Sequence, residues 1–279
     1  MNLTAKSEKE IRDSFFKHCP ENFLEKCISK NSISDMHIPK TGGTFLKKFF
    51  ENLPIDYINN GHQKCNPKID LYPDPTDSVP KFGLYQDDDS FEKSLKICVV
   101  RNPFEWLVSY YFHEQGDLLK DPPWTVTKGV GGIRWFYKNF EEFCLAYINE
   151  EKYWPPGLSE FRRFYPFQIF YENGNCAADF IIKNSSKNEL TTAAVTIAAA
   201  YGIDPRRIGD SLIKRKNTSK AKKKDYRHYY PDHLVDSLNK KWESILNVLE
   251  YDFYSGSTSD KIILDASNLK REGTSLLRI

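Results

Sequence analysis

The chain has 279 residues, a formal net charge of +2, and 40% hydrophobic and 14% aromatic residues. This length suits one large domain with a sizeable core, and the small net charge excludes the global basic field that marks a dedicated nucleic-acid-binding protein. No apolar run approaches the length of a membrane span, and the N-terminal sequence MNLTAKSEKEIRDS is neither a signal peptide nor a transit peptide.

The first predicted elements are helical. Residues 8–28 carry apolar side chains at helical spacing, and Pro20 divides them into two short helices. A short strand is expected over residues 32–38 and a helix over residues 43–52. A second strand and its loop are expected within residues 57–65.

The run LKICVV, residues 95–100, is continuously apolar, as is typical of a parallel strand that is buried on both faces. A helix start signal follows it. Asn102 can cap the helix, Pro103 suits the first helical position, and Glu105 can reach back in a capping box.

Further helices are predicted in the second half. One covers residues 140–149 after Asn139 as cap, another spans about 159–183, and an alanine-rich one over 188–201 ends at Gly202. A basic segment then precedes a last helix, whose apolar residues recur at steps of three and four: Leu234, Leu238, Trp242, Ile245 and Leu249.

Strands that alternate with helices predict an α/β fold with a central, mostly parallel sheet flanked by helices. We expect a single domain over residues 1–254, with the N-terminal helical segment 1–31 included. The polar tail, residues 255–279, is expected to be a C-terminal extension.

The six cysteines are scattered and form no CxxC pair. In a chain of this length they indicate reduced thiols in the cytoplasm rather than a disulfide framework. No metal site is expected, because no two cysteines or histidines have the usual short ligand spacing.

The stretch HIPKTGGTF, residues 37–45, joins the first strand to its helix. Gly42 and Gly43 allow close approach of the backbone, and the N–H groups of residues 42–45 point with the helix dipole at one place. Lys40 adds a positive charge, and two hydroxyls, those of Thr41 and Thr44, add donors. The loop is therefore predicted to bind an anion.

The loop differs from the phosphate loop of nucleotide hydrolases, GxxxxGK[ST], because its lysine precedes the glycines. The buried strand ends in Arg101, where a magnesium-dependent enzyme would place an aspartate. Both departures favour a donor substrate whose negative charge is neutralised by the protein itself rather than by magnesium. They argue against ATP hydrolysis.

The second motif is VVRNPFEWLVSYYFH, residues 99–113. Ser109 lies about two helical turns after the Asn102 cap and therefore on the same helix face. Together Arg101 and Ser109 can hold a second phosphate. The alternative is that Arg101 forms a structural ion pair and Ser109 fills a packing gap.

These two motifs resemble those of PAPS-dependent sulfotransferases, where PAPS is 3′-phosphoadenosine 5′-phosphosulfate. HIPKTGGTF is similar to their 5′-phosphosulfate loop, and RNPFEWLVS to their 3′-phosphate motif. The carbohydrate, heparan sulfate O-sulfotransferase-like branch is the most similar. The resemblance is strong over residues 35–50 and 95–112, and it is weaker over 161–182 and 214–253.

The resemblance implies a P-loop-kinase-like sulfotransferase fold, PAPS as donor and PAP as product. Lys40 would serve the leaving bridging oxygen, Phe45 would pack near the adenine, and the pair Arg101 and Ser109 would hold the 3′-phosphate. Four residues of the basic segment are expected to close over that phosphate, although a solvated basic face is an equal alternative: Arg215, Thr218, Ser219 and Lys220.

The chain also departs from its relatives. Many of them carry a second arginine where this chain has Trp106. The Golgi enzymes have an N-terminal membrane anchor, and we expect none here. We therefore expect a soluble cytoplasmic relative of bacterial type, without membrane or nucleic-acid partners.

His62, in the loop after the second strand, is the expected general base, since such loops border the ligand crevice of α/β sheets. A surface-loop histidine is the alternative. If His62 is not the base, an acidic residue within 87–92 is the next candidate.

The acidic run YQDDDSFEK, residues 85–93, is most simply a solvated turn; alternatively it receives a cationic acceptor. The function expected is sulfuryl transfer to a hydroxyl or amine of a small acceptor such as a natural product, without a metal. The alternatives are a sugar or glycan O-sulfotransferase, an unusual P-loop kinase, and a non-enzymatic module that binds PAP or RNA.

Overall fold

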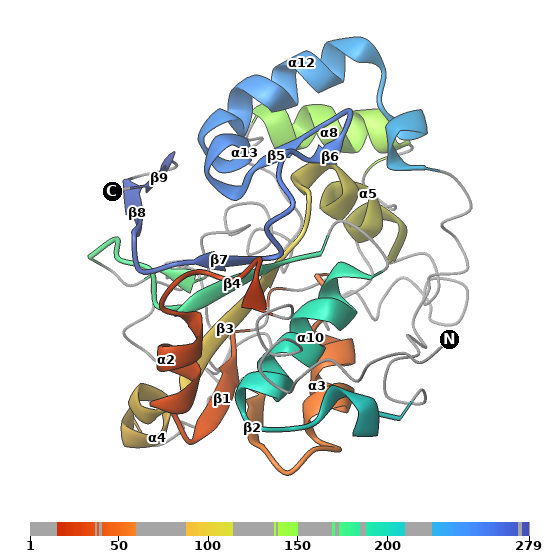
Figure 1. Ribbon diagram of the computed structural model, residues 1–279. Coiled ribbons are helices and arrows are strands. Elements are labelled where there is room, and N and C mark those ends of the chain that lie inside the picture. The colour runs from red at the N-terminus through yellow and green to blue at the C-terminus, as the bar shows by residue number, and fades with distance from the viewer. Residues whose placement is uncertain are drawn as a thin grey trace, which may run out of the picture.

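The structure is a computed structural model in which a central sheet is covered by helices on both faces (Figure 1). It describes the following residues: 16–36, 38, 41–59, 88–113, 137, 139–149, 169–170, 173–184, 188–209, 225–272 and 275–278.

The central sheet has five strands in the order β2-β1-β3-β4-β7. The first four run parallel and β7 pairs antiparallel with β4. This arrangement confirms the predicted α/β fold with a mostly parallel sheet. The strands are β1 (Ser32–Asp35), β2 (Asp56–Asn59), β3 (Leu95–Val100), β4 (Phe180–Lys183) and β7 (Ile263–Asp265).

Two groups of helices cover the sheet. One face carries α2 (Phe23–Ile28), α3 (Gly43–Phe50) and α10 (Glu189–Ala200), which share a core with the inward side chains of the strands. The opposite face carries four helices (Figure 1): α5 (Pro103–His113), α8 (Phe140–Asn149), α12 (Asp232–Lys241) and α13 (Glu243–Leu249).

The central strand β3 shows why five of the six residues in LKICVV are apolar. All six of its residues are buried. Leu95, Ile97 and Val99 belong to the core beneath α3 and α10, whereas Cys98 and Val100 belong to the core beneath α5 and α12. Successive side chains of a strand point to opposite faces, so a strand with a core on each side is apolar at nearly every position. The exception is Lys96, which is buried and whose ammonium pairs with the Glu92 carboxylate over 3.3 Å.

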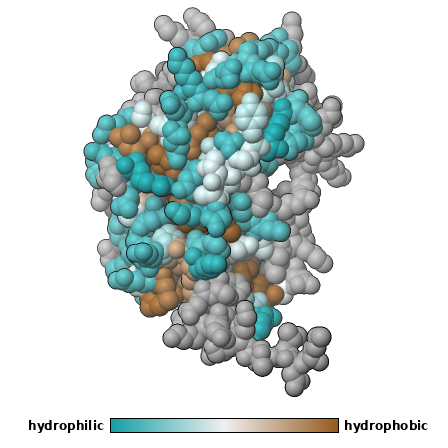
Figure 2. Space-filling view, turned by 45° about the horizontal axis from the view of Figure 1, so that its top comes forward, coloured by the Kyte–Doolittle hydropathy of each residue, from teal (hydrophilic) through white to brown (hydrophobic). Residues whose placement is uncertain are grey.

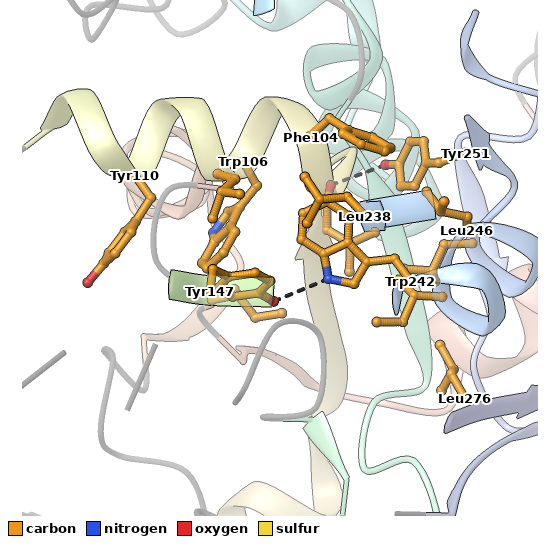
Figure 3. Close-up of a cluster of buried hydrophobic side chains, with 14 of the residues drawn as sticks. Phe104, Trp106, Tyr110, Tyr147, Leu238, Trp242, Leu246, Tyr251 and Leu276 are labelled. Carbon is orange, nitrogen blue, oxygen red and sulfur yellow. Dashed lines mark hydrogen bonds between the residues drawn. The ribbon is translucent and has the colours of Figure 1, made fainter. Parts of the chain in front are cut away.

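An aromatic cluster fixes the beginning of α5 (Figure 3). The ring of Phe104 packs edge-on against that of Trp242, with ring centroids 5.1 Å apart. The Trp242 indole N–H donates to the Tyr147 hydroxyl over 3.2 Å, and the Tyr230 hydroxyl donates to the carbonyl of Phe104 over 2.7 Å. Each buried polar tip therefore has a partner, and the first turn of α5 is held against α8 and α12.

The structure places a strand where sequence periodicity predicts the end of a helix over residues 159–183. Residues 180–183, FIIK, form β4, which is buried between β3 and β7. A short apolar run does not distinguish a buried strand from a helix by itself. The neighbouring strands on both sides decide the outcome.

The last predicted helix is in fact two helices. α12 ends at Lys241 and α13 begins at Glu243, and Trp242 between them has φ −104° and ψ 12°. The apolar residues of both helices still face one core, because Leu238, Trp242 and Ile245 are all buried in the aromatic cluster.

The segment from residue 255 onward, expected as an extension, contributes strands to the fold. Its β7 forms the fifth strand of the central sheet, with Asp265 opposite Phe180. The hairpin β8 (Leu269–Glu272) and β9 (Ser275–Arg278) follows it, and Leu276 is buried in the same core as α13. A short ribbon, β5 (Tyr251–Asp252) with β6 (Gly256–Ser257), precedes it.

β7 is fastened to the N-terminal helix α2 by Asp265. Its carboxylate accepts hydrogen bonds from the Asn22 amide over 2.6 Å and from the Lys26 ammonium over 3.2 Å. Burial alone would raise the pKa of Asp265, but these bonds and those from Ser267 outweigh it and lower the pKa to about 2. Segments 240 residues apart in sequence are thus joined beside the amino end of β4.

The outer surface is mixed. Figure 2 shows a face on which hydrophilic residues predominate, interrupted by smaller hydrophobic areas. Within the described ranges, none of the helices is both long enough and apolar enough to cross a membrane.

Candidate functional site

Three parallel strands end at one edge of the sheet and lead into polar residues. β1 leads toward Thr41 and Gly42, β3 runs into Arg101, and β4 runs into Asn184. In open α/β sheets the crevice outside the carboxyl ends of the strands is where ligands bind. The candidate site therefore lies at this carboxyl edge.

The loop after β1 has the backbone conformation that its glycines predict. Gly42 caps α3 with φ 120°, a region that L side chains rarely adopt. A Cβ at Gly42 would lie 2.6 Å from the Leu190 Cδ2 atom and 3.0 Å from the Asn184 Nδ2 atom. A side chain at position 42 would therefore strain the backbone and require the Leu190 side chain to shift.

The hydroxyl of Thr41 has a structural partner. Thr41 is buried, and its Oγ1 donates to the carbonyl of Ile38 over 2.7 Å, inside the loop itself. This bond closes the turn and competes with the expected role of the hydroxyl as a phosphate donor, which stays a prediction. The exposed Thr44 side chain, in the first turn of α3, keeps that role as a prediction.

The anion site is predicted at the N-terminus of α3, and the structure limits which N–H groups can take part. A helix leaves the N–H groups of its first turn without partners inside the helix, which here applies to Gly43 and Thr44. The Phe45 N–H instead donates to the carbonyl of Gly42 over 2.9 Å, and its ring packs on Phe49 with centroids 5.9 Å apart. Residue 45 thus drops out of the expected N–H cradle.

Arg101 lies at the carboxyl end of β3, as predicted. Its guanidinium forms an ion pair with the carboxylate of Glu105, one helical turn later, and its side chain is 18% exposed. The sequence had assigned Glu105 to a capping box. The ion pair orients the guanidinium. It also agrees with the alternative interpretation, in which Arg101 forms a structural ion pair.

Asn102 caps α5 as expected and also makes a second connection. Its Oδ1 accepts from the Phe104 N–H over 3.0 Å. Its buried Nδ2 donates to the carbonyls of Asp252 and Gly256 over 2.7 and 3.1 Å. The residue next to Arg101 thus fixes the β5–β6 ribbon over the start of α5.

Ser109 lies on α5, two turns beyond Asn102, and is half-buried. α5 is continuous from Pro103 to His113, so the predicted phase relation between Ser109 and the cap holds. Ser109 therefore lies on α5, and Arg101 lies two residues before the same helix begins.

Asn184 is a residue of this edge that sequence reasoning missed. It is buried, its side-chain amide donates to the carbonyl of Thr41, and its backbone N–H donates to the carbonyl of Val100 over 2.9 Å. Thr41 belongs to the first motif, and Val100 directly precedes Arg101. Recognising FIIK as a strand would have revealed a polar residue at its carboxyl end.

The neighbouring Lys183 is fully buried. Its Nζ donates to the carbonyl of Glu250 over 3.2 Å and to the Ser259 hydroxyl over 3.3 Å, and it lies 3.9 Å from the Glu250 carboxylate. Burial lowers the pKa of Lys183, while Glu250 acts in the opposite direction. These contacts fix the end of β4 beside Asn184.

The structure moves the acidic run away from the site. α4 (Asp88–Lys93) ends directly before β3 begins at Leu95, at the amino end of the sheet (Figure 1). A six-residue strand separates it from Arg101, a distance of about 20 Å. The described part of the acidic run, residues 88–93, therefore lies away from this edge, and Glu92 pairs with Lys96. Residues 85–87 lie outside the described residues.

Several predicted site residues lie outside the described residues: Lys40, His62, Arg215, Thr218, Ser219 and Lys220. β2 ends at Asn59 on the same edge as the loop after β1, three residues before His62. Among the residues that the structure describes, no group of three or more histidines, cysteines and acidic residues is arranged to hold a metal ion.

Comparison with known proteins identifies the family. Residues 27–252 match the family described as the sulfotransferase family. No curated protein and no solved structure matches the chain. The matched range includes the four parallel strands, both motifs and Asn184. Since it covers well over half of the 279 residues, the chain belongs to the sulfotransferase family.

Proposed function

We propose that this PAPS-dependent sulfotransferase transfers the sulfuryl group to a hydroxyl or amine of a small acceptor, such as a natural product. One observation carries the proposal. Asn184 contacts both Thr41 and Val100, so the loop before α3 and the strand end before Arg101 lie within the span of a single residue. Two anion sites at that spacing suit a nucleotide with phosphates on both its 5′ and 3′ positions.

The donor fits the residues that are present. The first turn of α3 offers the N–H groups of Gly43 and Thr44, and the positive φ of Gly42 turns the chain into this helix. Arg101 offers a partly exposed guanidinium at the next strand end. We assign the 5′-phosphosulfate to the loop and the 3′-phosphate to Arg101 and Ser109, with Phe45 near the adenine.

Bound PAPS supplies an activated sulfuryl group whose leaving oxygen bears the developing charge. We assign Lys40 to stabilise that oxygen by a charge-assisted hydrogen bond. Lys40 and Arg101 together supply the positive charge that a magnesium ion supplies in nucleotide hydrolases, so the proposal includes no metal. We also assign four residues of the basic segment to close over the 3′-phosphate: Arg215, Thr218, Ser219 and Lys220.

We assign His62 as the general base that removes the acceptor proton. It follows β2, whose carboxyl end lies at the same edge as the donor loop. A base in this position contributes about two to four powers of ten to the rate. Two histidines of the described part are less suitable, because His18 and His233 lie in exposed pairs with Asp260 and Glu141.

A small acceptor is preferred over a glycan on grounds of charge. The formal net charge of +2 gives no strong field for a sulfated polysaccharide. The alternative is an O-sulfotransferase that acts on a sugar or glycan, in keeping with the carbohydrate branch that the motifs resemble. A cationic acceptor has less support, since the described part of the acidic run, residues 88–93, lies at the opposite end of β3.

The test compares Lys40→Ala and His62→Ala with Lys48→Ala, an exposed lysine later in α3. Transfer from labelled PAPS to a panel of small alcohols, amines and sugars is measured together with PAP binding. Lys40→Ala should lower turnover by about a thousandfold or more. His62→Ala should lower turnover about a hundredfold while still binding PAP. Lys48→Ala should match the wild type.

Near-wild-type turnover of Lys40→Ala would contradict the leaving-group assignment. Loss of PAP binding in His62→Ala would move this residue from the acceptor side to the donor side. Transfer to sugars alone, with none to the other acceptors, would favour the glycan alternative.

A further inference from the structure

The amide of Asn184 connects three parts of the carboxyl edge. Its Nδ2 donates to the carbonyl of Thr41, and its backbone N–H donates to the carbonyl of Val100 over 2.9 Å. It is 8% exposed, so neither contact is readily replaced by water. A buried carbonyl that loses a hydrogen-bond donor is costly, which makes this kind of contact a strong constraint on a loop.

The Asn184 side chain also determines how closely the loop can approach. The position of a Cβ on Gly42 lies 3.0 Å from the Asn184 Nδ2 atom and 3.9 Å from its Cγ atom. The planar amide therefore covers the flat, side-chain-free surface of Gly42. Thr41 is held by a hydrogen bond and Gly42 by contact, immediately before the first turn of α3.

The backbone that carries Asn184 is held in place by the central sheet. It follows β4, which is paired on both sides, with Val100 opposite Lys183 in the register of β3. Lys183 is fixed by Glu250 and Ser259. A loop bonded to such a position takes up the geometry of the sheet, and the first turn of α3 follows the loop.

We propose that Asn184 is a positioning residue for the sulfuryl donor, holding the loop at Thr41 and Gly42 so that the N–H groups of Gly43 and Thr44 face the 5′-phosphate. This inference rests on the proposed function. Asn184 acts through the loop and through its spacing from Arg101, and it needs no contact with the donor itself. Loss of the Asn184 amide should therefore change the affinity for the sulfuryl donor and leave the affinity for the acceptor unchanged.

The chain offers a matched control at the other end of β4. Asn22 donates its side-chain amide to Asp265 over 2.6 Å, and Asp265 lies opposite Phe180, the first residue of β4. Asn22→Ala removes a long-range amide hydrogen bond of the same kind, away from the donor loop. Both variants should lower the melting temperature, so stability alone cannot account for a difference in binding.

The experiment measures PAP binding by calorimetry, and hydrogen exchange of residues 41–46, in the wild type, Asn184→Ala, Asn184→Asp and Asn22→Ala. We expect the dissociation constant for PAP to rise about tenfold in Asn184→Ala, which corresponds to about 1.4 kcal/mol. The rise should be larger in Asn184→Asp, whose carboxylate would face the Thr41 carbonyl and add negative charge near the phosphate. Exchange of residues 41–46 should increase in both and stay at the wild-type level in Asn22→Ala.

Wild-type PAP affinity or unchanged exchange in a folded Asn184 variant would overturn the positioning role. An equal loss of PAP affinity in Asn22→Ala would also overturn it, because the effect would then be one of general stability. If Asn184→Ala does not fold, Asn184→Ser, which keeps a donor at shorter reach, serves in its place. Failure of the wild type to bind PAP would overturn the proposed function itself, a result distinct from the others.

Discussion

The two ends of β4 use similar contacts for different purposes. At the amino end, Asn22 and Lys26 donate to Asp265 and join α2 to β7. At the carboxyl end, Asn184 donates to Thr41 and holds a loop whose helix begins one residue after Gly42. The first network pairs its own charges, whereas the second holds the loop at the N-terminus of α3, where we propose the donor binds.

The family match separates the same two regions. It covers residues 27–252 and so includes the carboxyl edge, but the three residues of the amino-end network lie outside it: Asn22, Lys26 and Asp265. The β7 strand that completes the sheet edge also lies beyond the matched range.

Of the variants that test the difference between the two ends of β4, Gly42→Ala is expected to have the largest effect on PAP affinity. An L residue at φ 120° costs about 1–3 kcal/mol, and the added Cβ would meet Leu190 at 2.6 Å. Calorimetry should show a PAP affinity roughly ten- to a hundredfold weaker, because the first turn of α3 must move.

Gly202→Ala is the control for conformational strain alone. Gly202 has φ +82°, but nothing lies within 4 Å of its Cβ position. It should lose about 1–2 kcal/mol of stability and keep wild-type PAP affinity. Equal losses of affinity in the two variants would show that positive φ matters and that contact with Asn184 and Leu190 does not.

Arg101→Ala sharpens the comparison within the carboxyl edge. A hydrogen bond to a charged group contributes about 1.5–3 kcal/mol, so PAP should bind roughly ten- to a hundredfold more weakly. Binding of 5′-AMP, which has no 3′-phosphate, should change little. Part of the loss would come from Glu105, whose carboxylate is left near the phosphate, and Arg101→Ala combined with Glu105→Gln should recover that part.

The matched control for Arg101 is Arg206→Ala, an exposed arginine paired with Asp204 on the outer surface. It should bind both nucleotides as the wild type does. The two-phosphate arrangement is contradicted if Arg101→Ala weakens PAP and 5′-AMP by the same factor.

The smallest effect is expected at the amino end, for Asp265→Asn. The pKa of Asp265 is lowered to about 2, below the ordinary value of about 3.9. The ionised form therefore stabilises the folded state above pH 4, and this contribution is lost as the pH falls through about 2. Urea unfolding should show the variant less stable by about 1–2 kcal/mol at pH 7, with the difference shrinking toward pH 2.

PAP affinity at pH 7 should not change in Asp265→Asn. A stability difference that stays constant between pH 7 and pH 2.5 would show that the carboxylate charge is not what joins α2 to β7. A change in PAP affinity would show that the two ends of β4 are coupled.

Local signals explain how much of this site could be predicted from the sequence. The glycines of the loop, the run LKICVV and the Asn102-Pro103 cap each depend on residues within one turn or strand, and the structure confirms those elements. The partners of hydroxyls and carboxylates were harder to predict, because each such group has several neighbours. The Thr41 hydroxyl bonds the carbonyl of Ile38, and the Glu105 carboxylate pairs with Arg101 in place of the expected helix cap.

β4 shows why the rest could not be predicted. FIIK is too short to reveal its period, and it becomes a strand because β3 and β7 lie beside it. Without that strand, Asn184 is one polar residue among several in KNSSKN, and nothing local marks it. The acidic run was misplaced for a similar reason, because only the topology shows which end of β3 it adjoins.

The most direct measurement of the central claim is calorimetric titration of the wild type with PAP, 5′-AMP and 3′-AMP. Two anion sites at the carboxyl edge predict saturable binding of one PAP, at least about tenfold tighter than either mononucleotide, since each phosphate has its own charged or dipolar partner. Binding of PAP no tighter than 5′-AMP, or no binding of PAP, would contradict the two-site arrangement.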